Sequence, residues 1–276
     1  MKGESVMGEE RILTEIKLWE NELHDISNEF GSYYEDWMQE SFERLPLKFK
    51  SKFEHFIEQW FLYTYTFLQS TTMQNDAIQR ILQTARTYDD TIDTIEDLKE
   101  LSIEKLTYLA EQQVARNRLY SFTQGGITGT GGWLLLGIDL PLIVTMNLRT
   151  VQLIGSSFGY NMNHPIEMLI ALKVFHAGSL PKRMQYNSWN ELKKSIEQQN
   201  SILEEKQIVK NEGWSEHIMK QIFKTIAIVS FKKKVIQGVP ILSIGIGAVT
   251  NYRLARQISD FAKKFYQYRS ITEKTN

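Results

Sequence analysis

Two glycine-rich apolar stretches constrain most strongly what this chain can fold into. The first spans 121–160 (SFTQGGITGTGGWLLLGIDLPLIVTMNLRTVQLIGSSFGY) and the second spans 235–266 (VIQGVPILSIGIGAVTNYRLARQISDFAKKFY). Each passes from apolar residues interrupted by glycine, through a proline, to an Asn-x-Arg triplet, at 147–149 and 251–253. This composition is typical of segments that are buried in a core or lie against a membrane.

Helical spacing of apolar residues dominates the rest of the chain. One stripe runs from Ile12 to Phe30 and another, rich in aromatic residues, from Phe49 to Phe67. No sustained period-two alternation indicates a strand. The sequence therefore predicts an all-α protein, a single compact multi-helix bundle with the two glycine-rich segments packed centrally as helices. We expect an N-terminal aromatic-rich helical part over 1–90 and a helical domain over 91–276, joined in one continuous fold.

Several helix limits follow from local signals. Asp139-Leu140-Pro141 is typical of a helix start, because Asp accepts hydrogen bonds from free N–H groups and proline tolerates the first turn. Helix is expected to resume through Leu98 and Leu101, to span 166–177, and to continue as an exposed helix between 187 and 212. On the last helix, Leu254, Ile258, Phe261 and Phe265 are predicted to form the core face.

The glycines do not match a nucleotide-binding loop. A phosphate loop would need Lys and Ser/Thr where Gly132 and Trp133 stand, and no strand precedes the segment as a dinucleotide fingerprint requires. We interpret the glycines as residues that let neighbouring helices approach closely. The predicted packing glycines are Gly125, Gly129, Gly155, Gly159, Gly245 and Gly247.

Neither stretch is suited to a simple membrane span. Val235–Thr250 is uncharged, but a helix of this length reaches only about 24 Å, against a hydrocarbon core of about 30 Å. Asp139 interrupts the first stretch. Shallow contact with a membrane surface stays open, because Lys232, Lys233 and Lys234 directly precede the second stretch and could meet anionic headgroups. A solvated helix end is the alternative interpretation of these lysines.

Polar side chains inside the apolar stretches form the candidate site. A buried Arg149 needs a carboxylate, backbone carbonyls, water or a phosphate as partner. Asp139 lies too far along one straight helix to serve, so the partner must come from elsewhere in the fold or from a ligand. The predicted polar cluster comprises Asp139, Asn147, Arg149, Asn251 and Arg253.

Composition excludes several activities. The chain has no cysteine, which removes disulfides, thiolate nucleophiles and Cys-ligated metals. Its five histidines lack metal-ligand spacing, and neither a metal nor a cofactor is expected. A net charge of −1 argues against nucleic-acid binding. The acidic residues at 89–100 favour a helix start over a cation site. The polar, acidic N-terminal sequence predicts a cytoplasmic location, with the inner membrane face open.

The order of motifs resembles the EcsC family of bacterial proteins. The matching features are Gly125-Gly126, Gly137-x-Asp139-Leu140-Pro141, Arg149, Phe158-Gly159-Tyr160-Asn161, Val239-Pro240, Gly245-x-Gly247, Asn251 and Ala262-x-x-Phe265-x-x-x-Arg269. The likeness covers about residues 95–270, and the family pattern implies an acidic residue where Asn161 stands. The resemblance implies a helical protein without an established activity, named for a gene beside an ABC exporter.

Three hypotheses follow. We expect a non-enzymatic, cytoplasmic accessory of an ABC transporter or export system, associated with the membrane surface or with the transporter itself. The alternative is a lipid- or amphiphile-binding protein, or an unrecognised hydrolase, that uses a cavity between the glycine-rich segments. The third is an oligomerising role through the N-terminal stripe. The oligomeric state itself is not fixed by the sequence.

Overall fold

The structure, a computed structural model, describes residues 2–28, 34–68, 71–125, 136–197, 213–236 and 244–275. Within these ranges every regular element is a helix, which confirms the all-α prediction. The elements are α1 (Lys2–Asn28), α2 (Tyr34–Glu43), α3 (Leu47–Leu68), α4 (Thr71–Ala85), η1 (Glu96–Glu100), α5 (Ile103–Gly125), α6 (Leu136–Ser157), α7 (Pro165–Ser179), α8 (Lys182–Glu197), α10 (Trp214–Ile236) and α11 (Ile244–Thr275).

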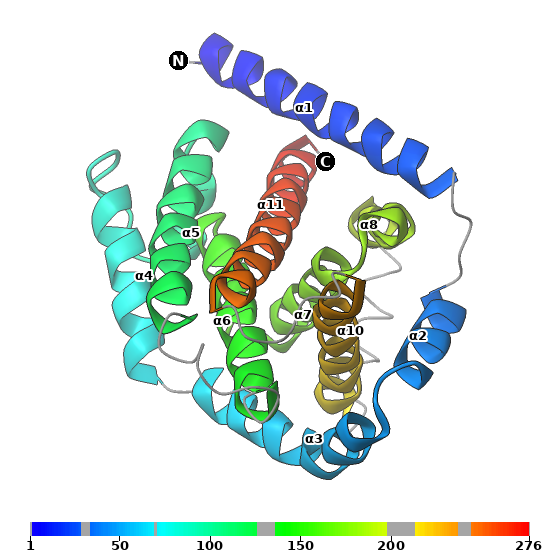
Figure 1. Cartoon of the computed structure of the whole chain (residues 1–276). Helices are drawn as coiled ribbons and strands as arrows, with labels where there is room; N and C mark the ends of the chain where they lie inside the picture. Colours follow the sequence, from blue (N-terminus) through cyan, green and yellow to red (C-terminus); the bar gives the residue numbers. More distant parts are fainter. Residues whose placement is uncertain are drawn as a thin grey trace.

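The helices α5, α6, α7 and α11 form the centre of the bundle. Helix α11 packs against each of the other three, and α6 also contacts α3 and α10. In the view of Figure 1, α1 crosses one side of this group and α3 crosses the opposite side. The helical parts of the two glycine-rich segments, α6 and α11, thus pack directly together, as predicted. The stretches 126–135 and 237–243 lie outside the described residues.

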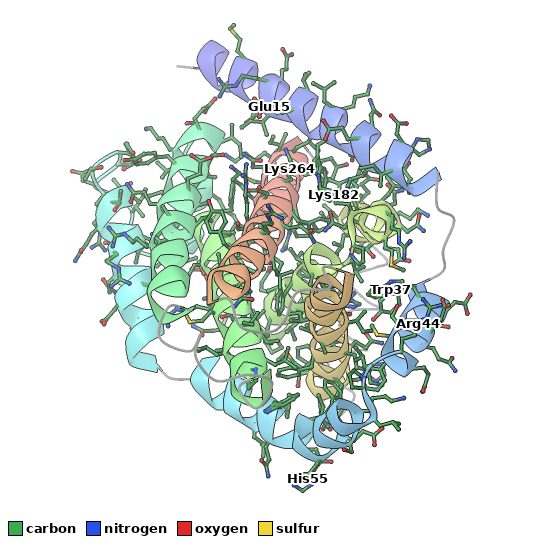
Figure 2. All side chains as sticks on the ribbon, in the orientation of Figure 1. Glu15, Trp37, Arg44, His55, Lys182 and Lys264 are labelled. Carbon is green, nitrogen blue, oxygen red and sulfur yellow. The ribbon has the colours of Figure 1, made fainter. Side chains whose placement is uncertain are left out.

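The predicted core face of α11 is confirmed. Leu254, Ile258, Phe261 and Phe265 are all buried, and they join one apolar cluster that extends from Ile12 to Ile271. Trp37 of α2, labelled in Figure 2, is also buried in this cluster. Because the cluster draws on α1 as well as α11, both ends of the chain contribute to the same core. Within the described ranges, no helix combines the length and apolar character needed to cross a membrane.

The N-terminal stripe is used inside this chain. Ile12, Ile16 and Leu23 are buried, and the Trp19 ring packs edge-on against Trp189 of α8 at a centroid distance of 4.9 Å. Glu20 Oε1 accepts hydrogen bonds from Trp189 Nε1 (2.5 Å) and Lys193 Nζ (2.7 Å). The stripe that suggested an oligomer contact therefore fixes α1 to α8 and α11.

Helix limits differ from the predictions at two places. The helix α6 begins at Leu136, so Pro141 lies inside it, and the prediction that Asp139-Leu140-Pro141 starts the helix is wrong. Packing of α6 against its neighbours outweighs the backbone hydrogen bond that the proline removes. Leu98 belongs to η1, and Leu101 lies in an extended break before α5. For the predicted exposed helix, α8 accounts for 187–197, and 198–212 lies outside the described residues.

Close approach of α7 and α11 depends on Gly178. A Cβ atom added at this position would lie 3.2 Å from the Ile258 Cα and 3.3 Å from the Phe261 Cβ. We expect Gly178→Val to lower the free energy of unfolding by about 1–3 kcal/mol, because the backbone of α11 would have to move. Ala115→Val, at an exposed position of α5, is the control and should stay within about 0.5 kcal/mol. Urea unfolding of both variants measures the difference; equal values would contradict the prediction.

Candidate functional site

A cluster of charged and aromatic side chains joins four elements near the C-terminal end of α11. Its members, here called the Arg269 cluster, are Lys99 from η1, Tyr160 from the turn after α6, Glu167 from α7, and Arg269 and Glu273 from α11. Tyr160 and Arg269 each belong to a family-like motif noted above. The fold therefore brings together two motifs that are more than a hundred residues apart in the chain.

Arg269 is the centre of the cluster and is only 9% exposed. Its Nη1 and Nη2 atoms donate to the two carboxylate oxygens of Glu167 at 2.6 and 2.8 Å. Its Nε donates to Glu273 Oε1 at 2.7 Å. Burial opposes the charge of Arg269, but the hydrogen bonds to Glu167 and the charge interactions with Tyr160, Glu167 and Glu273 together outweigh it and raise the pKa. The guanidinium is thus fully charged and held in a bidentate geometry.

The aromatic ring of Tyr160 packs against both cations of the Arg269 cluster. The Arg269 guanidinium lies 3.9 Å from the centroid of its ring, and the Lys99 ammonium lies 4.5 Å from the same centroid. The Tyr160 hydroxyl donates to Glu273 Oε2 at 3.1 Å. Burial raises the pKa of this hydroxyl well above its usual value, so Tyr160 stays protonated and acts as a donor.

Asn161 explains why the chain departs from the family-like pattern at this position. Its Nδ2 donates to Glu96 Oε1 at 2.8 Å, and its Oδ1 accepts from the backbone N–H of Asn163 at 3.0 Å. An aspartate here would place a second carboxylate against Glu96, which the amide avoids. The amide therefore ties the turn after α6 to η1.

Gly155 and Gly159 have different roles on the two sides of this turn. A Cβ on Gly155 would lie 2.7 Å from Cζ of Tyr266, so this glycine makes room for the Tyr266 ring, as the packing prediction requires. Gly159 has φ of +86° and ends α6 in a Schellman motif, in which Tyr160 N donates to the Gly155 carbonyl at 3.1 Å. Gly159 thus ends α6, and a Cβ there would lie 3.2 Å from the backbone N of Lys99 in η1.

The Arg269 cluster contains equal numbers of positive and negative charges. Two cations, Lys99 and Arg269, face two anions, Glu167 and Glu273. The Lys99 Nζ lies 3.6 Å from Glu273 Oε2. The charged groups satisfy one another within the protein, so this arrangement clamps the end of α11 to α7, η1 and the turn after α6. The Arg269 cluster therefore holds these elements together through ion pairs.

A second polar group connects α2, α7 and α10. Tyr34 Oη lies 3.0 Å from His176 Nε2, and Thr225 Oγ1 lies 3.3 Å from the same nitrogen. Burial lowers the pKa of His176 to about 4 and raises that of Tyr34 to about 12. The imidazole is therefore neutral near pH 7, and its Nε2 can accept a hydrogen bond from the Tyr34 hydroxyl.

The structure places the predicted polar cluster along α6 and α11. The Asn147 amide donates to the Ile143 carbonyl of its own helix at 2.7 Å. Arg149 is partly buried and already has an interaction within the protein. Asn251 is partly buried and Arg253 is exposed. The side chain of Asp139 lies outside the described residues. Their grouping as one site stays a prediction.

The remaining predicted positions lie at helix ends. Gly125 is the last residue of α5, Gly245 and Gly247 lie in the first turn of α11, and Gly129 is outside the described residues. Lys232, Lys233 and Lys234 lie in α10, but their side chains are outside the described residues. In the acidic segment, Asp97 Oδ2 accepts from the backbone N–H groups of Asp93 (3.0 Å) and Thr94 (2.7 Å), so its role there is local capping.

Only part of the Arg269 cluster could be recognised from the sequence. Arg269 and Tyr160 stood in family-like motifs, but Lys99, Glu167 and Glu273 were not predicted. Glu167 follows Pro165 in the first turn of α7, a position where an acidic residue has an ordinary helix-dipole explanation. No local signal distinguishes it as the partner of Arg269.

Comparison with known proteins places these features in a family. The model of the EcsC protein family matches residues 10–271, which includes the aromatic N-terminal part that carried no recognised motif. "Uncharacterized protein YdbA" of Bacillus subtilis (strain 168) is 24% identical over 280 residues, covering 95% of this chain and 92% of that protein. "Protein EcsC" of the same organism is 21% identical over 208 residues, covering 73% of this chain and 79% of that protein. No solved structure matches this chain significantly.

Proposed function

This chain belongs to the EcsC protein family, and we propose that it is a non-enzymatic accessory protein that works at the inner membrane surface beside an ABC export system. Two parts of this proposal have separate support. The membrane part rests on where the glycine-rich segments lie in the fold. The export part rests on the gene neighbourhood from which the family takes its name.

The observation that carries the membrane part is the register of the central helices. Lys263 of α11 pairs with Glu111 of α5 at 2.8 Å, and Gln267 donates to Thr107 at 3.0 Å. Rising numbers on α11 meet falling numbers on α5, so these helices are antiparallel. The beginning of α11 therefore lies level with the end of α5.

The helix α6 begins at the same end of the bundle. Gly155, near its C-terminal end, contacts Tyr266 in the last part of α11, so α6 and α11 run in the same direction. We call the end where α5 finishes at Gly125 and where α6 and α11 begin the glycine pole. In the sequence, the residues that follow α5 and those that precede α11 are rich in glycine and apolar residues, including Trp133-Leu134-Leu135.

An apolar pole of this kind supports shallow contact with a bilayer. Apolar side chains gain free energy on leaving water, and an insertion a few residues deep needs no membrane-spanning helix. Lys232–Lys234 lie near the end of α10, and seven residues separate that end from α11. The eight Cα–Cα steps from Ile236 to Ile244 span at most about 29 Å, so the end of α10 lies within that distance of the start of α11.

A triple substitution at the pole tests the membrane part. We expect Trp133→Ser/Leu134→Ser/Leu135→Ser to bind phospholipid vesicles at least roughly tenfold more weakly in flotation experiments, because three apolar side chains are lost. The matched control is Met7→Ser/Leu18→Ser, which removes side chains that are 72% and 61% exposed on α1. Circular dichroism checks that both variants are folded. A wild-type protein that neither sediments with membranes at low salt nor floats with vesicles would contradict the proposal.

A separate experiment tests the export part. Crosslinking in intact cells, followed by purification of the tagged wild-type protein, should recover a subunit of an ABC transporter, and the triple variant should recover less. Recovery of no transporter subunit from a protein that does bind membranes would refute the export part alone.

A further inference from the structure

Exposed cations lie around the end of α7, close to the middle of α11. Lys182 and Arg183 open α8, and Arg253 lies in the early part of α11. Lys182 and Arg253 are exposed and Arg183 is partly exposed; Lys182 is labelled in Figure 2. The helices α8 and α11 are distant in sequence, so the proximity of their cations is a product of the fold.

Two glutamines fix the positions of these cations. Gln185 Nε2 donates to the carbonyls of Gly178 and Leu180 at 3.0 and 3.1 Å. Gln257 Nε2 donates to the same two carbonyls at 2.7 and 2.8 Å. The first turn of α8 and the fourth turn of α11 thus meet at the end of α7.

The cations lie one turn further out than the glutamines. Lys182 precedes Gln185 by three residues and Arg253 precedes Gln257 by four, so each shares a helix face with its glutamine. The two helices run in the same direction, because the Trp189 ring meets Phe261 at 5.7 Å and, further along both helices, Lys193 lies 4.9 Å from the Tyr268 ring centroid. Both cations therefore project toward the glycine pole.

These cations differ from several others on the same helices. Lys193, Lys263 and Arg269 pair with carboxylates within the protein. Arg256, beside the group, lies 3.5 Å from Asp260. By contrast, no carboxylate among the described residues forms an ion pair with Lys182, Arg183 or Arg253. A tyrosine, Tyr252, is 42% exposed beside them.

We propose that Lys182, Arg183 and Arg253 bind the phosphate headgroups of anionic phospholipids, with Tyr252 at the lipid–water interface. This rests on the proposed membrane function and names the lipid chemistry that the glycine pole recognises. Charge complementarity supports an anionic surface, and the adjoining apolar stretches support a bilayer as its source. A net charge of −1 fits docking through a local group of cations rather than general binding of polyanions.

Vesicle binding tests the proposal with a charge-reversal variant. Lys182→Glu/Arg183→Glu/Arg253→Glu should bind vesicles that contain phosphatidylglycerol on the order of a hundredfold more weakly than wild type, about fivefold for each cation lost. Binding of wild type should weaken as salt rises, and that of the variant should depend less on salt. The matched control is Arg11→Glu/Lys17→Glu/Arg80→Glu, which makes the same charge change at exposed positions of α1 and α4 and should bind like wild type.

The outcomes separate this inference from the proposed function. Equal binding of wild type to pure phosphatidylcholine vesicles and to anionic vesicles would overturn headgroup recognition and leave membrane association standing. Equal binding of the charge-reversal variant and wild type to anionic vesicles would likewise overturn headgroup recognition and leave membrane association standing. Absence of binding to either vesicle would overturn both. A fourth outcome is that the wild type binds a short DNA duplex but no vesicles, and that the charge-reversal variant loses this DNA binding. That outcome would reassign the three cations to nucleic-acid binding.

Discussion

Replacing Arg269 by alanine is expected to lower the free energy of unfolding by about 3–5 kcal/mol, a loss that few single substitutions produce. The substitution leaves the Glu167 carboxylate, whose side chain is 16% exposed, without its bidentate partner. It also removes the cation that stacks on Tyr160 at 3.9 Å. The end of α11 would lose its contacts with α7 and with the turn after α6 together.

Urea unfolding measures this loss against two controls. Arg256→Ala breaks another ion pair on α11, with Asp260 four residues later, but both side chains are largely exposed. We expect it to cost less than about 1 kcal/mol. The double variant Arg269→Met/Glu167→Met removes both buried charges together and should recover much of the loss, because no uncompensated charge remains. If Arg269→Ala costs no more than Arg256→Ala, Arg269 does not hold the cluster together.

Acidification below neutral pH is expected to destabilise the protein through His176. Its pKa is lowered by burial to about 4 in the folded protein, compared with about 6.5 in the unfolded chain. The folded state therefore resists protonation. The stabilising contribution is complete above about pH 6.5 and is lost progressively as the pH falls toward 4. A difference of this size corresponds to about 3 kcal/mol.

The variant His176→Gln isolates this contribution. The glutamine amide can still accept a hydrogen bond from the Tyr34 hydroxyl and lie beside Thr225, but it does not titrate. We expect the wild-type free energy of unfolding to fall between pH 7 and about pH 4 more steeply than that of the variant, by up to one proton per molecule. Tyr34→Phe is the control, because it keeps the imidazole and should keep most of the slope. Equal slopes for His176→Gln and wild type would refute the role of His176.

Much of the fold follows from the spacing of apolar residues. Leu254 and Ile258 mark one face of α11 at helical intervals, and the structure buries that face. The same reasoning located α3 and α7 to within a few residues, whereas α1 begins ten residues before the predicted stripe. Local signals misled where tertiary packing overrode them. Pro141 resembles a first-turn residue, yet it lies inside α6 because that helix is held on several sides by its neighbours.

The residues of the candidate site could be predicted far less well from local sequence pattern. Gln257 lies outside the predicted core face of α11, but its amide caps the end of α7. Gly159 stood at the right interval for helix packing, and only its φ of +86° shows that α6 has already ended. The partners of Gln257 belong to another element, so a pattern read along one helix could not reveal them.

The sequence by itself determined that this chain is helical and which faces of its helices are buried, because burial of apolar side chains repeats with the helical period. Only the tertiary structure decided that Arg269 pairs with Glu167, 102 residues away, and that Lys182 and Arg253 share one pole. Such pairings depend on the direction and register of helices packed side by side. Helix packing sets these through the shapes of many side chains at once, which no local interval in the sequence records.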